Sequence, residues 1–272
     1  MSSSRPTDSQ LFEAIVATAI EAGRVVHNIY RGGFDVSHKA DESPVTSADH
    51  AAEAVILQKL REVAPQIPII AEEEVAAGRV PTVGNEFFLV DPLDGTKEFI
   101  QKRGDFTVNI ALIRDRVPVL GVVYAPAKSM LFAGNAGAQS AFRSDENTDG
   151  SSAAPRRAIK VRQVRKSGVT AVSSRSHSTP ETDAYLAQFN VSDRVSIGSS
   201  LKFCLVAAGE ADLYPRLGPT MEWDTAAGHA VLLAAGGSVW APGGTPLVYG
   251  KSGFRNTFFI ASGALTPPPL AA

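Results

Sequence analysis

The sequence contains one cysteine, no long uncharged apolar run and almost no excess of charge of either sign. The lone thiol, Cys204, excludes an internal disulfide and a zinc site built from paired thiolates. Because it stands in an apolar run, residues 203–206, we expect a small buried side chain in a reducing compartment. Lys and Arg number 26 against 28 Asp and Glu, which leaves no broad basic field for nucleic acid. We therefore expect no stable nucleic-acid partner.

Targeting and nucleotide-loop signals are missing too. No run reaches the roughly 18 to 20 uncharged apolar residues of a membrane span, and the polar residues 1–8 lack the apolar stretch of a secretory signal. We expect a soluble, cytoplasmic protein, with peripheral attachment to the cytoplasmic face of the inner membrane as the alternative. The absence of a Gly-x-x-x-x-Gly-Lys-(Ser/Thr) loop argues against a P-loop nucleoside triphosphatase. The histidines form no spaced pair with another candidate ligand, and we interpret them as ordinary surface or core residues: His27, His38, His50, His177 and His229.

The first half of the chain predicts two helices packed on a sheet. Apolar residues recur at the spacing of one helix face over residues 8–31 and 47–63. Gly32-Gly33 ends the first helix, and Pro65 breaks the pattern after the second. Short runs rich in branched and aromatic residues then predict strands at residues 67–70, 87–90, 108–113, 117–124 and 130–133.

A polar segment, residues 144–155, separates the two halves and has too little apolar surface to pack. We expect a mobile loop or hairpin tip there. Beyond it strands and helices alternate, which favours an α/β layered domain: strands at 168–173 and 212–214, helices at 181–189, 200–208 and 225–235. A chain of 272 residues allows one large or two medium domains. We predict an N-terminal α+β domain over residues 1–158 and a C-terminal α/β domain over residues 159–272.

The most informative segment follows a predicted strand and reads Asp91-Pro92-Leu93-Asp94-Gly95-Thr96. Pro92 removes a ladder donor, so we expect the strand to end at Asp91. Gly95-Thr96 predicts a helix start, whose free N–H groups suit a phosphate, while Mg²⁺ prefers carboxylate and carbonyl oxygens. The structural alternative is an Asx turn with a helix cap.

Two further acidic groups stand at comparable places. Residues 72–74, three glutamates, directly follow a predicted strand, and Asp224 precedes a helix of small residues. Each alone has a simpler explanation, a solvated surface for the glutamates and a favourable helix dipole for Asp224. Together with Asp91 and Asp94 they predict a cation site. Gly228 in the small-residue helix would let another backbone or a ligand approach closely.

In this order the three groups resemble the motifs of the inositol monophosphatase superfamily: a Glu-Glu pair, Asp-Pro-(Ile/Leu)-Asp-Gly-Thr and Trp-Asp-x-Ala-(Ala/Gly). The resemblance covers most of the chain. Three runs are more narrowly similar to the CysQ branch of 3′(2′),5′-bisphosphate nucleotidases, namely residues 198–204, 213–216 and 223–230. The resemblance implies an α/β (α+β layered) fold, the α-β-α-β-α five-layer sandwich of these phosphatases.

The resemblance also implies a Mg²⁺-dependent phosphomonoesterase that binds two or three ions and is sensitive to lithium. It assigns catalytic roles to Asp49 and Thr96, as a water-activating pair, with Glu73 in support. From its position alone, Asp49 would be only a helix cap. The implied metal ligands are Glu72, Asp91, the Leu93 carbonyl, Asp94 and Asp224. The implied substrate contacts are Glu72, Leu93, Asp94, Gly95, Thr96, Ser199, Lys202, Arg216 and Asp224.

The expected substrate is a small phosphorylated nucleotide, adenosine 3′,5′-bisphosphate, cut to AMP and phosphate in sulfur assimilation or nucleotide recycling. Phosphoadenosine phosphosulfate is a second expected substrate. Lys202 follows a Gly-Ser-Ser turn and suits the remaining 5′-phosphate, which Arg216 can bind bidentately; alternatively Lys202 only snorkels from an amphipathic helix. Inositol monophosphatase activity, fructose 1,6-bisphosphatase activity and a non-catalytic regulatory binding role stay open. We expect a monomer or a homodimer.

Overall fold

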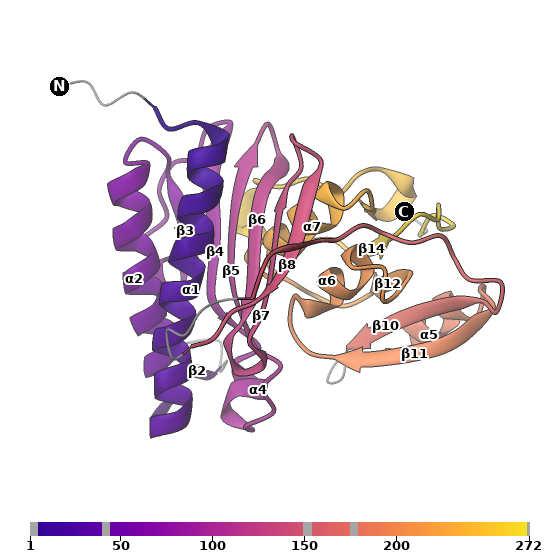
Figure 1. Ribbon diagram of the computed structural model, residues 1–272, viewed down its shortest axis with the longest axis horizontal. Helices are drawn as coiled ribbons and strands as arrows, with labels where there is room; N and C mark the ends of the chain where they lie inside the picture. Colours follow the sequence, from indigo (N-terminus) through magenta and orange to yellow (C-terminus); the bar gives the residue numbers. More distant parts are fainter. Residues whose placement is uncertain (1–4, 40–43, 149–153, 175–178, 271–272) are drawn as a thin grey trace.

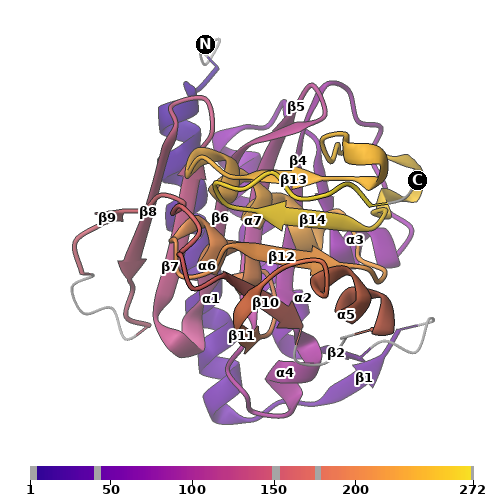
Figure 2. The ribbon, with the colours of Figure 1, turned by 90° about the vertical axis from the view of Figure 1, so that its right-hand side faces the viewer.

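Five layers follow one another across the molecule in the computed structural model, which describes residues 5–39, 44–148, 154–174 and 179–270 (Figure 1). Two helices, α1 (Asp8–Gly32) and α2 (Ser47–Val63), cover the outer face of a seven-stranded sheet. Helices α6 (Leu201–Ala207) and α7 (Trp223–Ala234) lie between this sheet and a five-stranded sheet. The fifth layer is α5 (Pro180–Leu186), in front of the five-stranded sheet in Figure 2. The predicted α-β-α-β-α sandwich is confirmed.

The seven-stranded sheet follows the order of the chain. β3 and β4 are parallel, and every later pair is antiparallel. Along β5, Val108 and Ile110 face the core under α1 and α2, whereas Ala111 and Ile113 face the core around α6 and α7. Both faces are therefore buried, as in a layered α/β protein. The strands are β3 (Ile69–Ala71), β4 (Glu86–Asp94), β5 (Thr107–Arg114), β6 (Val117–Ala125), β7 (Met130–Asn135), β8 (Ser140–Asp145) and β9 (Arg157–Ala158).

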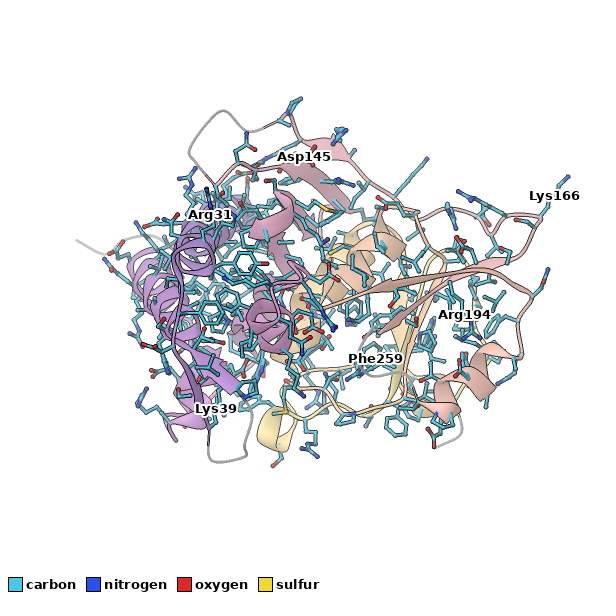
Figure 3. All side chains as sticks on the ribbon, turned by 90° about the horizontal axis from the view of Figure 1, so that it is seen from below. Arg31, Lys39, Asp145, Lys166, Arg194 and Phe259 are labelled. Carbon is cyan, nitrogen blue, oxygen red and sulfur yellow. The ribbon has the colours of Figure 1, made fainter. Side chains whose placement is uncertain are left out.

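The five-stranded sheet has the order β11-β10-β12-β14-β13. Its strands are β10 (Val169–Ser174), β11 (Val191–Ile197), β12 (Leu213–Arg216), β13 (Ser238–Trp240) and β14 (Phe259–Ser262). Phe259 is fully buried against α6, whereas Lys166 projects at the far end of this half (Figure 3). The remaining elements are short: β1 (Val36–His38), β2 (Pro44–Thr46), α3 (Glu72–Ala76), α4 (Thr96–Ile100), and the 3₁₀ turns η1 (Pro126–Lys128), η2 (Pro242–Gly244) and η3 (Ser252–Phe254).

The predicted end of β4 at Asp91 is wrong. The strand continues through Pro92 to Asp94, with Asp91 opposite Asn109 and Asp94 opposite Thr107. Two residues of β4 thus face one residue of β5, which is a β-bulge. Proline is tolerated there because a bulge already interrupts the ladder of hydrogen bonds.

The polar segment between the two halves begins inside a strand, because β8 runs to Asp145. Residues 149–153 of the segment lie outside the described residues. β9 ends at Ala158 and β10 begins at Val169, and the division into two domains at residue 158 stays a prediction. Among the residues described, no helix combines the length and apolar character needed to span a bilayer.

Candidate active site

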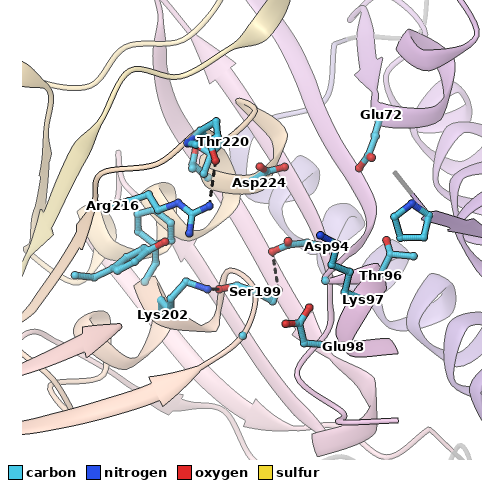
Figure 4. A pocket seen from close by; sticks show the side chains of 17 residues that line it. Glu72, Asp94, Thr96, Lys97, Glu98, Ser199, Lys202, Arg216, Thr220 and Asp224 are labelled. Atoms are coloured by element: carbon cyan, nitrogen blue, oxygen red, sulfur yellow. Dashed lines mark hydrogen bonds between the residues drawn. The ribbon is translucent and has the colours of Figure 1, made fainter. Parts of the chain in front are cut away.

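A cavity of about 320 Å³ lies where the two halves meet. The ends of β3 and β4 form one wall, and the starts of α6 and α7 with the end of β12 form the other (Figure 4). The cavity collects residues that are distant in the sequence. Its lining includes these predicted site residues: Glu72, Asp94, Gly95, Thr96, Ser199, Lys202, Arg216 and Asp224.

Each of the four expected carboxylate ligands already accepts a hydrogen bond from the protein. Asp91 Oδ1 accepts from the backbone N–H of Leu93 at 3.0 Å, and Asp224 Oδ2 accepts from that of Met221 at 2.8 Å. Glu72 Oε1 pairs with the ammonium of a lysine at 2.7 Å. Asp94 Oδ2 is the most engaged, because it accepts from Ser199 Oγ at 2.6 Å, Ser200 N at 2.8 Å and Ser200 Oγ at 3.0 Å.

The electrostatics of these carboxylates favour a cation. Burial, and then the charges of Glu72 and Asp94, raise the pKa of Asp91 well above its usual range. Burial and the same two charges raise the pKa of Asp224 well above its usual range. The group therefore repels itself in the absence of a positive charge, and its oxygen-only donor set suits a hard cation such as Mg²⁺.

No preformed chelate is present among the described side chains, since no three acidic, histidine or cysteine groups converge on one point. The hydrogen bonds described above hold one oxygen of each carboxylate toward a protein donor. Binding of an ion would require the carboxylates to turn their remaining oxygens together. The backbone carbonyl of Leu93, the fifth expected ligand, accepts from Thr96 Oγ1 at 3.2 Å.

Asp49 caps α2 and also lies beside Thr96. Its Oδ2 accepts from the N–H of Thr46 at 2.8 Å and from its hydroxyl at 2.7 Å, which caps α2. Its Oδ1 lies 3.4 Å from the hydroxyl of Thr96. Asp49 is 2% exposed, and burial raises the pKa of its carboxyl.

Glu73 does not line the cavity. It is 5% exposed and lies beside Lys39, whose ammonium is 2.6 Å from Glu73 and 2.7 Å from Glu72. Burial lowers the pKa of Lys39, but the two carboxylates outweigh it and raise the pKa. The backbone N–H of Glu73 donates to Glu53. Glu73 is thus placed behind the expected ligand Glu72.

On the opposite wall, Lys202 and Arg216 supply positive charge. Lys202 is only 6% exposed, so it does not snorkel to the surface; its ammonium donates to the Ser199 carbonyl at 2.6 Å and lies 5.6 Å from the ring centre of Tyr214. Burial lowers the pKa of Lys202 to about 8. The guanidinium of Arg216 donates to the Pro219 carbonyl at 3.0 Å. Two cations therefore face the cavity a short way from the acidic group (Figure 4).

Gly95 turns the chain into α4 with a φ of +91°, a region that favours glycine. A Cβ at this position would also lie 3.1 Å from the Asp105 carbonyl. The turn places the backbone of Gly95 and Thr96 on the cavity wall.

Sequence reasoning missed four residues around the site: Lys39, Glu53, Asn109 and Ser200. Glu53 stands four residues after Asp49, so both lie on one face of α2. Asn109 and Thr107 were detectable as polar residues two apart in an apolar strand. Lys39 carries no comparable signal, since its partners are 33 and 34 residues away in the sequence.

Comparisons with known proteins identify the family of the chain. Residues 7–258 match the model of the inositol monophosphatase family. The chain is similar to the 3′(2′),5′-bisphosphate nucleotidase CysQ of Shigella flexneri, with 46% identity over 255 residues, covering 93% of this chain and 99% of that protein. The CysQ of Escherichia coli (strain K12) is 45% identical over 255 residues, with the same coverage. The crystal structure of CysQ from Bacteroides thetaiotaomicron superposes with a TM-score of 0.78 at 39% identity, covering 94% of this chain and 97% of that one. The chain belongs to the inositol monophosphatase family.

Proposed function

We propose that the chain is a 3′(2′),5′-bisphosphate nucleotidase that removes the 3′-phosphate of adenosine 3′,5′-bisphosphate, giving AMP and phosphate. The observation that carries this proposal is the cavity itself, which brings the positive charges of Lys202 and Arg216 into one space with the carboxylates of Asp94 and Asp224. A substrate with two phosphates can use both groups. The near full-length similarity to bisphosphate nucleotidases supports the same substrate.

Two or three Mg²⁺ ions fit the oxygen donors of this site, with Glu72, Asp91, the Leu93 carbonyl, Asp94 and Asp224 as their ligands. When bound, Mg²⁺ supplies Lewis-acid polarisation of the phosphoryl group and acidifies a water molecule. The mutual repulsion of the buried carboxylates supports this assignment.

The chain's own groups orient the reactants and move the proton. The hydroxyl of Thr96 holds the attacking water and passes its proton to Asp49 Oδ1, 3.4 Å away. The N–H groups of Gly95 and Thr96 hold the oxygens of the 3′-phosphate. Lys202 and Arg216 hold the 5′-phosphate, as a point charge and a planar fork respectively. Glu73, through Lys39, supports the position of Glu72.

We further propose that phosphoadenosine phosphosulfate is a second substrate and that lithium inhibits the enzyme. We also propose a location in the cytoplasm, because a reducing compartment keeps a free thiol such as that of the buried Cys204 reduced. The sulfated nucleotide keeps the 3′-phosphate that reacts. It requires only that the part of the cavity beside Lys202 accommodate a 5′-phosphosulfate, which is larger than a 5′-phosphate.

The test is release of phosphate by the purified protein with Mg²⁺, comparing adenosine 3′,5′-bisphosphate, inositol 1-phosphate and fructose 1,6-bisphosphate at equal low concentrations. We expect the nucleotide to be the best substrate. Preference for inositol 1-phosphate or fructose 1,6-bisphosphate would overturn the roles of Lys202 and Arg216. Failure to release phosphate from any of the three would favour a regulatory binding protein.

A further inference from the structure

The inner face of β5 changes character as it reaches the cavity. Thr107 and Asn109 share this face with Ala111 and Ile113, since residues two apart in a strand point the same way. Ala111 and Ile113 belong to the apolar core around α6 and α7. Thr107 and Asn109 are 0% and 1% exposed, and buried polar groups are destabilising unless they are hydrogen-bonded. The stability of this face therefore depends on the hydrogen-bond partners of Thr107 and Asn109.

These partners belong to the turn before α6. Asn109 Nδ2 donates to Ser200 Oγ at 2.9 Å, and Asn109 Oδ1 accepts from Thr107 Oγ1 at 3.0 Å. The hydroxyl of Thr107 is in turn hydrogen-bonded to that of Ser199. The first sheet thus holds both serines of the turn through adjacent side chains.

Ser200 joins the two acidic segments of the site. Its hydroxyl lies 3.0 Å from Asp94 Oδ2 and 2.7 Å from the backbone carbonyl of Asp224. A hydroxyl has one proton to donate, and Asn109 occupies an acceptor position on the same oxygen. Asn109 therefore leaves the single proton of the Ser200 hydroxyl for one of two acceptors, Asp94 Oδ2 or the Asp224 carbonyl.

The same turn carries the positive wall of the cavity. Ser199 has a φ of +57°, a strained conformation for a residue with a side chain. Its carbonyl accepts from the ammonium of Lys202, which lies three residues later, on the first turn of α6. The Ser199 hydroxyl and the Ser200 N–H also donate to Asp94 on β4. The hydrogen bonds to β5 and β4 together hold the Ser199 carbonyl, and hence Lys202, in place.

We propose that Asn109 and Ser200 are positioning residues that give the site its selectivity for a nucleotide with a second phosphate. The inference rests on the proposed function. Asn109 holds Ser200, Ser200 fixes the turn against Asp94, and the turn presents Lys202 to the 5′-phosphate. Neither residue touches the substrate in this account.

The test compares adenosine 3′,5′-bisphosphate with adenosine 3′-monophosphate, which share the reacting phosphate and differ only in the 5′-phosphate. The ratio of their kcat/KM values measures the contribution of the second phosphate. We expect Asn109→Ala and Ser200→Ala each to lower this ratio about tenfold, the effect of losing one hydrogen bond to a charged group. The double variant should lower it little further, because the two residues act as one unit.

Ser144→Ala is the matched control. Ser144 is 0% exposed on β8 of the same sheet, and its hydroxyl donates to Glu146 at 2.7 Å, far from the cavity in the sheet order. We expect its ratio to equal that of the wild type. A general structural effect would instead lower the ratio in all three single variants and overturn the proposal.

Two further outcomes would overturn it. In the first, Asn109→Ala and Ser200→Ala lower kcat/KM equally for both nucleotides. In that case Asn109 and Ser200 position Asp94 and do not position Lys202 for the 5′-phosphate. If the wild type prefers the bisphosphate and the variants keep that preference, the inference fails while the proposed function stands. A wild type that treats both nucleotides equally would overturn the proposed function and the inference together.

Binding provides an independent measurement. AMP, the expected product, keeps the 5′-phosphate, and adenosine lacks it, so calorimetric titration of both in the presence of Mg²⁺ reports the same contribution without turnover. We expect the variants to lose about tenfold in affinity for AMP relative to adenosine. If Asn109→Ala does not fold, Ser200→Ala alone decides, because it removes only a hydroxyl.

Discussion

The backbone N–H of Glu73 donates to Oε2 of Glu53 over 2.9 Å, although 20 positions separate the two residues. Helix α3 begins beside this contact, and its cap residue, Ala71, makes no side-chain hydrogen bond. The first N–H groups of a helix lack partners inside it, so α2 supplies one from outside. One face of α2 thus supports both acidic segments, through Glu53 at α3 and through Asp49 at Thr96.

Glu53→Ala is expected to lower the free energy of unfolding by about 1 to 3 kcal/mol, because it leaves the Glu73 N–H buried without an acceptor. Glu53→Gln should retain most of the stability. Burial raises the pKa of Glu53 to about 7, so a neutral side chain with the same carbonyl oxygen suits the site. Urea unfolding measures the free energy of unfolding of both variants. The control is Glu62→Ala, an exposed residue of the same helix, which should change stability by less than about 0.5 kcal/mol. Equal midpoints for Glu53→Ala and the wild type would contradict the capping role.

Asp94→Asn is expected to reduce Mg²⁺-dependent phosphate release by at least about a hundredfold, because the variant loses the charge of a proposed Mg²⁺ ligand. Chelation of divalent ions should abolish release by the wild type. The measurement is the initial rate against Mg²⁺ concentration up to saturation. Asp193→Asn, on the exposed edge strand β11, serves as the control and should follow the wild-type curve. An unchanged rate for Asp94→Asn at saturating Mg²⁺ would remove Asp94 from the site.

The affinity for AMP is expected to fall as the pH rises through about 8. Burial lowers the pKa of Lys202 to about 8, against the opposing charge of Asp94, so the ammonium loses its proton above this pH. The second pKa of a phosphate monoester is about 6, and the ligand keeps its charge over the same range. Calorimetric titrations in the presence of Mg²⁺ at several pH values test this. Lys202→Met should bind AMP weakly at every pH and lack the step; a step that persists in this variant would assign it to another group.

Acid is expected to destabilise the fold through His229. This residue is 3% exposed, its Nδ1 is 3.0 Å from the hydroxyl of Tyr249, and burial, with the charge of Lys251, lowers its pKa to about 3. The unfolded chain takes up the proton near pH 6.5, before the folded chain does. The contribution of His229 to stability is therefore complete above pH 6.5 and is lost as the pH falls toward 3, at up to about 1.4 kcal/mol per pH unit.

His229→Gln should remove this part of the pH dependence, whatever its effect on stability at neutral pH. Urea unfolding between about pH 7 and 4.5 gives the slope. The exposed His50 provides a matched variant, His50→Gln, for which we expect the wild-type slope. Identical slopes in the wild type and His229→Gln would show that other groups determine the acid response.

Gly228→Ala is expected to destabilise the protein by about 1 to 3 kcal/mol through overpacking between α6 and α7. A Cβ at this position would lie 2.7 Å from Cδ2 and 2.8 Å from Cβ of Phe203. The close approach at this glycine is made by an aromatic side chain, and not by the backbone or ligand expected from the sequence. Gly32→Ala is the control, because no atom lies within 4 Å of its added Cβ. Thermal unfolding of the two variants should differ clearly; equal midpoints would mean that α6 and α7 separate easily.

Local patterns predicted the long helices and the acidic motifs correctly. α1 and α2 follow their predicted bounds to within a residue, because the spacing of apolar residues and the glycines or prolines at the ends act within a few residues. The motif at residues 91–96 carried its own signals as well, a buried strand and a glycine turn.

Contacts between residues far apart in the sequence could not be predicted from such local patterns. β11 has a mostly exposed, polar sequence because it is the edge strand of its sheet, and only its neighbour β10 defines it as a strand. The contact between Asn109 and Ser200 joins residues 91 positions apart. Glu53 and Lys39 likewise acquire their roles from partners that only the folded chain brings close.

The bulge in β4 determines the direction in which its two aspartates point. Successive residues of a strand point to alternate sides, so residues 91 and 94 of a regular strand would lie on opposite faces. The extra residue restores the parity: Asp91 and Asp94 pair with Asn109 and Thr107, which share one face of β5. The bulge therefore allows a three-residue step between the aspartates to end on one face of the sheet. Without the bulge, regular pairing of the same residues would turn one carboxylate into the core beneath α1 and α2, where no cation and no nucleotide could reach it.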